Sequence, residues 1–131
     1  MPHVERVGAS GPTEQDFETL LSSHEPAVAK TARALRRVVA EAFPEAVEQV
    51  DFGNRLLAVG KTMAMRDLAF AVIPHTAHVN LQLANGADLP NERGMIEGTG
   101  KRIRHVKVRT VEAASSPDLR AIVDAQVALR R

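Results

Sequence analysis

The chain has 131 residues, of which 44% are hydrophobic and 25% charged, and its formal net charge is +1. This length suits one domain with a single core, and the composition fits neither a disordered chain nor, by bulk charge, a nucleic-acid binder. The chain has no cysteine and only four aromatic residues, all Phe, which excludes disulfides, thiolate chemistry and the stacking surfaces of single-strand binding domains.

The first twelve residues, 1–12, contain glycine, serine and proline without apolar periodicity. They predict a flexible lead-in, so we expect the folded domain to span residues 13–131. Thr13 can cap a first helix, because acidic residues follow it and apolar residues then recur at helical spacing: Phe17, Leu20 and Leu21.

A second helix is the clearest element in the sequence. Pro26 suits its first turn, and Pro44 ends it, since the residue before a proline is pushed out of the helical region. One apolar stripe runs along this helix, formed by Val28, Ala32, Leu35, Val39 and Ala42.

After the second helix the pattern changes from helical to alternating. Five strands are predicted, at residues 47–52, 55–59, 66–74, 78–83 and 103–110. Pro117 then opens a last helix with an apolar stripe of Leu119, Ile122, Val123, Val127 and Leu129.

The order of these elements predicts an α+β fold. The short links favour a two-layer domain in which a mostly antiparallel five-stranded sheet is covered on one face by two N-terminal helices and one C-terminal helix. We expect a single core that contains Leu35, Val39, Phe70, Leu81, Val106 and Ile122.

The face of the sheet away from the helices should be polar. If the apolar residues of the last two strands point to the helices, then period 2 places six polar side chains on the opposite face: His78, Asn80, Gln82, His105, Lys107 and Arg109. If those strands are neighbours, His78 and His105 could bind a metal or an anion together. The alternative is an ordinary solvated sheet face.

The stretch 97–109 is the best candidate for a functional surface, because a glycine turn precedes a strongly basic strand. It holds five of the seventeen Lys and Arg residues. Backbone N–H groups at Gly98-Thr99-Gly100 can form a concavity for an anion beside fixed positive charge. The candidate ligand-binding residues are Gly98, Thr99, Gly100, Lys101, Arg102, Arg104, His105 and His78. The alternative is a structural turn before a solvated edge strand.

The same region resembles a known family. The segments Asp88-Leu89-Pro90, 94–102 and 104–108 are similar to the signature of the YdhG-like bacterial domains, a family of unknown function. The resemblance runs from about residue 25 to the C-terminus and implies an α+β fold. Some members resemble frataxin and have been proposed as iron chaperones.

Two functions follow as expectations. The first is a binding domain, rather than an enzyme, that holds a small anionic ligand or a protein partner at the basic turn and needs no cofactor. The second is a frataxin-like iron chaperone, with Glu14, Glu18 and Glu48 as candidate iron ligands. No phosphate-loop or His-Glu-x-x-His motif is present.

The sequence also bears on location and assembly. No stretch approaches the ~20 apolar residues of a membrane span. We therefore expect a cytoplasmic protein that binds neither membrane nor nucleic acid, and a homo-oligomer is compatible with the sequence.

Overall fold

A computed structural model describes residues 2–131. Its helices are α1 (Pro12–Leu21), α2 (Pro26–Ala42), α3 (Val111–Ala114) and α4 (Pro117–Arg130), with single 3-10 turns η1 (Met65–Asp67) and η2 (Gly86–Asp88). Its strands are β1 (Glu5–Arg6), β2 (Val47–Asp51), β3 (Leu56–Gly60), β4 (Leu68–Pro74), β5 (Val79–Leu83), β6 (Ile96–Glu97) and β7 (Arg104–Val108). None of the helices within residues 2–131 is long and apolar enough to cross a membrane.

The strands form one antiparallel open sheet in the order β1-β2-β3-β4-β5-β7-β6. The α+β class and the five long strands were predicted, but a five-stranded sheet was wrong, since the sheet has seven strands. The two additional strands, β1 and β6, lie at opposite edges and contain two residues each. Two residues are too few to show the alternation by which strands are recognised in a sequence.

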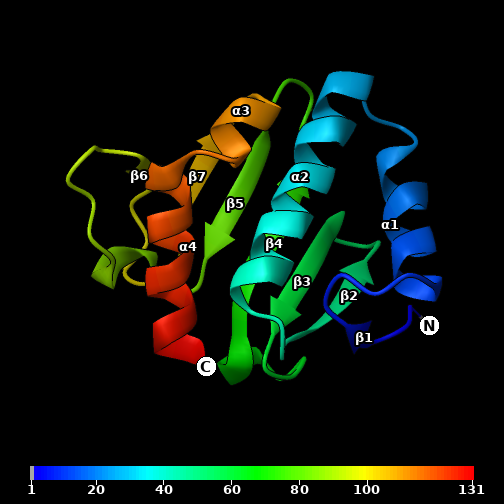
Figure 1. Ribbon diagram of the computed structural model, residues 1–131, viewed down its shortest axis with the longest axis horizontal. Coiled ribbons are helices and arrows are strands. Elements are labelled where there is room, and N and C mark those ends of the chain that lie inside the picture. The colour runs from blue at the N-terminus through cyan, green and yellow to red at the C-terminus, as the bar shows by residue number, and fades with distance from the viewer. Residues whose placement is uncertain (1) are drawn as a thin grey trace.

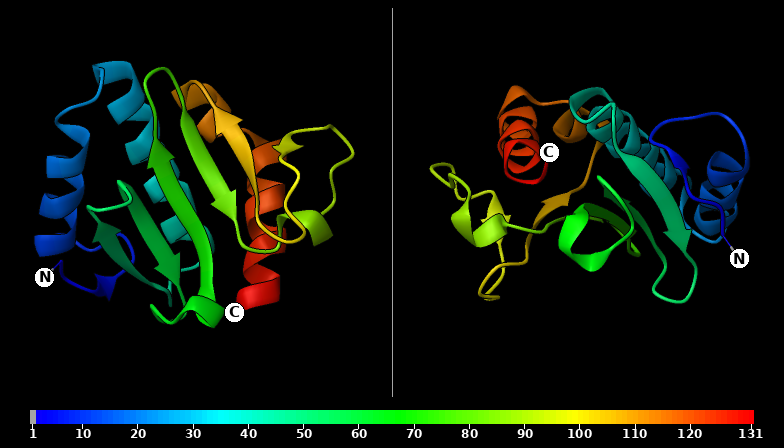
Figure 2. Two further views of the ribbon diagram at one scale, coloured as in Figure 1. Left: turned by 180° about the vertical axis from the view of Figure 1, so that it is seen from behind. Right: turned by 90° about the horizontal axis from the view of Figure 1, so that it is seen from below.

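The helices lie on one face of this sheet (Figure 1). Seen from behind, the sheet stands in front of α2 and α4 while α1 lies at its edge beside β2, and the opposite face carries no α-helix among the described residues (Figure 2). All six predicted core residues are buried between the layers, and none is more than 8% exposed. The predicted two-layer arrangement therefore places an open sheet face on the side away from the core.

The segment predicted as a flexible lead-in, residues 1–12, contains strand β1 and several contacts with the rest of the domain. Residue 1 lies outside the described residues, but Glu5 and Arg6 pair with β2, and the next residue, Val7, is 7% exposed. The backbone N–H of Gly8 donates to the Glu48 carboxylate at 3.1 Å. This segment is held by contacts with residues some forty positions away, which no local pattern could reveal.

The start of α1 also differs from expectation. Gly11, not Thr13, is the N-terminal cap, and Thr13 lies within the helix, where its side chain donates to the carbonyl of His3. The Glu5 carboxylate accepts the backbone N–H of Thr13 at 2.5 Å. A carboxylate from β1 thus satisfies a free donor at the helix N-terminus, and the hydrogen bonds with Thr13 lower the pKa of Glu5.

Candidate anion-binding site on the open sheet face

The glycine-rich stretch forms the loop of a hairpin between β6 and β7. Gly98 has a φ of +117°, a conformation that favours glycine. A Cβ at Gly100 would lie 2.6 Å from the carbonyl oxygen of Ile103, so this position needs glycine for space and not for its φ. The Nε of Arg104 donates to the carbonyl of Gly100 at 2.9 Å. The loop is thus closed by its own backbone and by one arginine side chain.

The predicted site residues of this hairpin are divided between two faces. Thr99, Lys101 and Arg102 are exposed in the loop. His105 lies opposite Gln82 on the open face, as the alternation predicted. Arg104 points the opposite way from β7, and its guanidinium donates to the carbonyl of Gly100 in the loop. Arg104 therefore closes the loop, and its place on β7 turns it away from the open face.

His78 lies at the far end of the open face. The strand register places Gln82 opposite His105, and His78 is four residues before Gln82. Four residues of extended strand span about 13 Å, so the two histidines do not form the predicted ligand pair. The ring of His78 instead stacks on His75, with ring centroids 4.8 Å apart. Burial, and then the charge of His75, lower the pKa of His78.

A cleft of about 550 Å³ opens beside the glycine-rich hairpin on this sheet face, and we call it the open-face cleft. Three small side chains from β3 and β4 form its alanine floor: Ala58, Ala69 and Ala71. Two large apolar side chains line it while remaining in contact with water, Met65 at 83% exposed and Ile103 at 53%. The cleft is therefore an apolar depression in a face that was predicted to be polar.

Three arginines also line the open-face cleft, and we call them the rim arginines: Arg66, Arg102 and Arg130. Across residues 2–131, none of the three forms an ion pair with a carboxylate. The only acidic residue lining the cleft is Asp51, and hydrogen bonds from the side chain and backbone of Asn54 lower its pKa. The cleft therefore has an excess of positive charge.

Arg130 is held in place by a part-buried hydrogen-bond network. Its Nε donates to the side-chain oxygen of Asn85 at 2.7 Å, and its Nη1 donates to the carbonyl of Arg66. The side chain of Asn85 also accepts a hydrogen bond from the fully buried Gln126 at 3.0 Å, and Gln126 accepts the Asn85 backbone N–H at 2.8 Å. These contacts fix the orientation of the Arg130 guanidinium, and its remaining N–H groups stay available in the cleft.

The sequence analysis missed the alanine floor and two of the rim arginines. Ala69 and Ala71 belong to a continuous apolar run, which indicates a buried strand without distinguishing its two faces. The alternation of these alanines with Phe70 and Val72 was the available signal, because a row of small residues leaves space above a sheet. Arg130 could not be placed from sequence, since it reaches the cleft from the end of α4.

The candidate iron ligands do not form an open metal site. Glu48 is fully buried, and its carboxylate accepts three hydrogen bonds from the guanidinium of Arg36 at 2.5 to 3.2 Å. Glu14 lies 3.6 Å from Arg36, and Glu18 accepts two hydrogen bonds from Arg33 at 2.7 and 2.8 Å. Each carboxylate is already matched by an arginine. No group of three or more His, Cys, Asp or Glu side chains within the described part of the chain is arranged to hold a metal ion.

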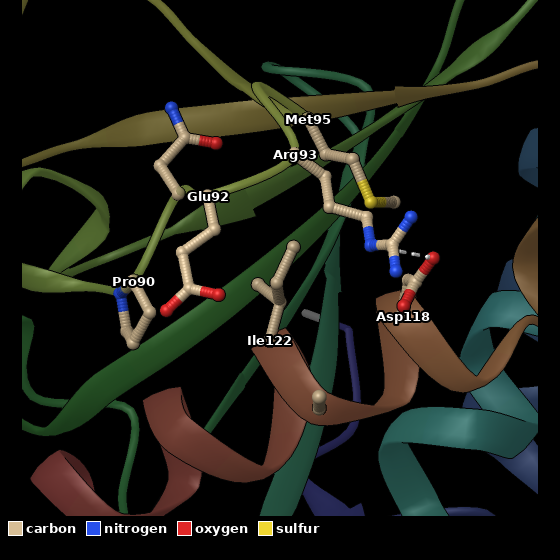
Figure 3. A pocket seen from close by; sticks show the side chains of 8 residues that line it. Pro90, Glu92, Arg93, Met95, Asp118 and Ile122 are labelled. Carbon is tan, nitrogen blue, oxygen red and sulfur yellow. Dashed lines mark ion pairs between the residues drawn. The ribbon is translucent and has the colours of Figure 1, made fainter.

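A smaller pocket of about 280 Å³ lies between the loop after η2 and α4 (Figure 3). Met95 and Ile122 face one another across it, and the guanidinium of Arg93 lies 3.4 Å from the Asp118 carboxylate. Arg93, the cation of this smaller pocket, is thus paired with an acid, whereas the rim arginines of the open-face cleft are not. The open-face cleft is therefore the better candidate for an anion site.

Fold and site together define an α+β domain in which helices cover one face of an antiparallel sheet and a cationic cleft opens on the other. No family model, curated protein or solved structure matches this chain.

Proposed function

We propose that this chain is a non-enzymatic binding domain that holds a small anionic ligand in the open-face cleft, beside the glycine-rich basic hairpin. The observation that carries this proposal is the convergence of three rim arginines on one cleft, without a carboxylate partner within residues 2–131. A guanidinium presents several N–H donors in one plane and binds carboxylates and phosphates through paired hydrogen bonds. An anion would supply the negative charge that this surface lacks.

Two further features support the same location. Lys101 and Lys107 extend the positive surface from the loop along β7. The segments that resemble the YdhG-like domains include the hairpin that supplies Arg102, and membership of that family remains our proposal. The cleft volume also lies within the roughly 300 to 1,000 Å³ of small-molecule sites.

The chemistry of the lining favours binding over catalysis. Asp51 is the one carboxylate in the cleft, and its lowered pKa keeps it ionised near neutral pH. A general acid or base works best with a pKa near the working pH. The lining therefore provides charge and hydrogen-bond donors rather than a group suited to proton transfer.

An NMR titration with inorganic phosphate and acetate tests this function. We expect saturable shifts of amide signals at residues 102–105 and at Arg66, weaker at high salt because exposed charges are screened. Arg102→Ala should weaken binding at least fivefold. Arg37→Ala removes the same charge from an exposed position on α2, on the helix-covered face, and should leave the affinity unchanged. Shifts that never saturate, or equal losses in both variants, would refute a site at this cleft.

A further inference from the structure

We infer that the ligand of the open-face cleft is an amphipathic carboxylate, whose apolar part lies on the alanine floor while its carboxylate is bound by the rim arginines. This inference rests on the proposed function and specifies the class of ligand.

The alanine floor creates an apolar groove across the sheet. Ala58 pairs with Ala71, Ala71 with Gln82, and Gln82 with His105, so one row of the open face crosses four strands. Cβ groups alone cover the β3 and β4 part of this row, and the larger side chains of Met65 and Ile103 line the same cleft. The row leads from the apolar floor directly to the polar side chains of β5 and β7.

The two apolar walls favour a ligand with a hydrophobic part. Met65 and Ile103 are among the few large apolar side chains exposed to water, and both line this cleft. Covering apolar surface is favourable by about 25 cal/mol per Å². Inorganic phosphate or acetate would leave this surface in water, whereas an alkyl or aryl group seated between the walls would cover it.

The polar end is preorganised for a carboxylate. Asn85 and Gln126 fix the guanidinium of Arg130, and Arg102 is adjacent in sequence to the wall residue Ile103. A donor that is already ordered loses less conformational freedom on binding. The apolar groove and a fixed cation thus lie in the same cleft, which is the arrangement that an apolar chain with a terminal carboxylate matches.

Charge also selects against a second copy of the chain as the occupant. The open face carries Lys107 and Arg109 in addition to the rim arginines, against two acids, Asp51 in the cleft and Glu97, which pairs with His105 between β6 and β7. Two such faces brought together would repel one another, because like charges at an interface are unfavourable. An anionic small molecule has the complementary charge.

Calorimetric titrations of the full chain with three probes test the inference. Octanoate, kept below its micellar concentration, carries both parts of the ligand, acetate carries the carboxylate alone, and 1-octanol carries the chain alone. We expect octanoate to bind at least tenfold more tightly than either of the other probes.

Variants of the cleft then separate the two ends. Ala58→Leu fills the floor at a half-buried position and should weaken octanoate at least tenfold while leaving acetate binding unchanged. Ala77→Leu adds the same side chain on the exposed β4–β5 turn and should change neither. Met65→Ser removes an exposed wall without opening the core, so it tests the groove even if Ala58→Leu fails to fold. Arg102→Ala should weaken octanoate and acetate alike.

The outcomes distinguish this inference from the proposed function. If octanoate binds no more tightly than acetate while Arg102→Ala weakens both, the anion site stands and the amphipathic ligand is refuted. If octanoate and 1-octanol bind equally well and Arg102→Ala has no effect, the cleft is a purely apolar site and both proposals fail. If octanoate does not bind and the chain forms a dimer that Met65→Ser dissociates, the occupant is a second copy and the inference is overturned.

Discussion

Replacing Arg36 by methionine should be among the most destabilising single changes in this protein. Arg36 reaches from α2 to the fully buried carboxylate of Glu48 on β2, and its own side chain is only 12% exposed. It also donates to the carbonyl of Ala9 at 2.9 Å. Burial disfavours the charged arginine, but the hydrogen bonds and charge of Glu48 outweigh that effect and raise the pKa of Arg36. Arg36 therefore stays charged in the folded protein.

The expected loss follows from what Arg36→Met leaves behind. The Glu48 carboxylate would remain buried with the Gly8 N–H as its hydrogen-bond donor. Removing one partner of a buried pair costs about 3 to 5 kcal/mol, a large part of the roughly 5 to 15 kcal/mol by which domains are stable. Arg36→Met/Glu48→Leu also removes the stranded charge, so the double variant should recover part of the loss although the Gly8 N–H loses its partner.

Urea denaturation followed by circular dichroism at pH 7 measures both variants. The matched control is Arg33→Met, because Arg33 is also on α2 and pairs with a glutamate, Glu18 of α1, at a site where both side chains are more than 40% exposed. Exposed pairs contribute about 0 to 1 kcal/mol. The reasoning is refuted if Arg36→Met and Arg33→Met lose the same stability, or if the double variant is less stable than Arg36→Met alone.

Two further predictions concern stability. Leu81→Ala removes a fully buried side chain from the middle of β5 and should cost about 2 to 5 kcal/mol of unfolding free energy, measured by urea denaturation. Leu129→Ala, at a position 52% exposed on α4, should cost under about 0.5 kcal/mol. Equal losses in the two variants would contradict the assignment of Leu81 to the core. The pKa of His78 is lowered in the folded state, chiefly by burial and then by the charges of His75, Lys107 and Arg109. The contribution of His78 to stability is therefore complete above the unfolded pKa near 6.5 and is lost as the pH falls below that value. His78→Gln should therefore flatten the fall in stability between pH 7 and pH 5, and an unchanged slope would contradict this assignment.

The periodicity of the sequence was enough to predict the long elements and the faces they bury. The stripe that includes Leu35 and Val39 identified α2, and strict alternation identified both faces of β5. These patterns are local, because a helix repeats every 3.6 residues and a strand every two. Burial of one face then places the core, and His105 and Lys107 lie on the open face as predicted.

Only the tertiary structure decided how these faces are combined into a site. The register of β5 and β7 separates His78 from His105, and a strand pattern is the same in every register that differs by two residues. Arg130 reaches the cleft from a helix 64 positions after Arg66, whose carbonyl it binds. Just after the edge strand β1, the backbone of Gly8 donates to a buried glutamate in β2 that an arginine in α2 also binds. Such contacts join segments far apart in the chain, so a local sequence pattern determines which residues are buried but not which distant residues meet.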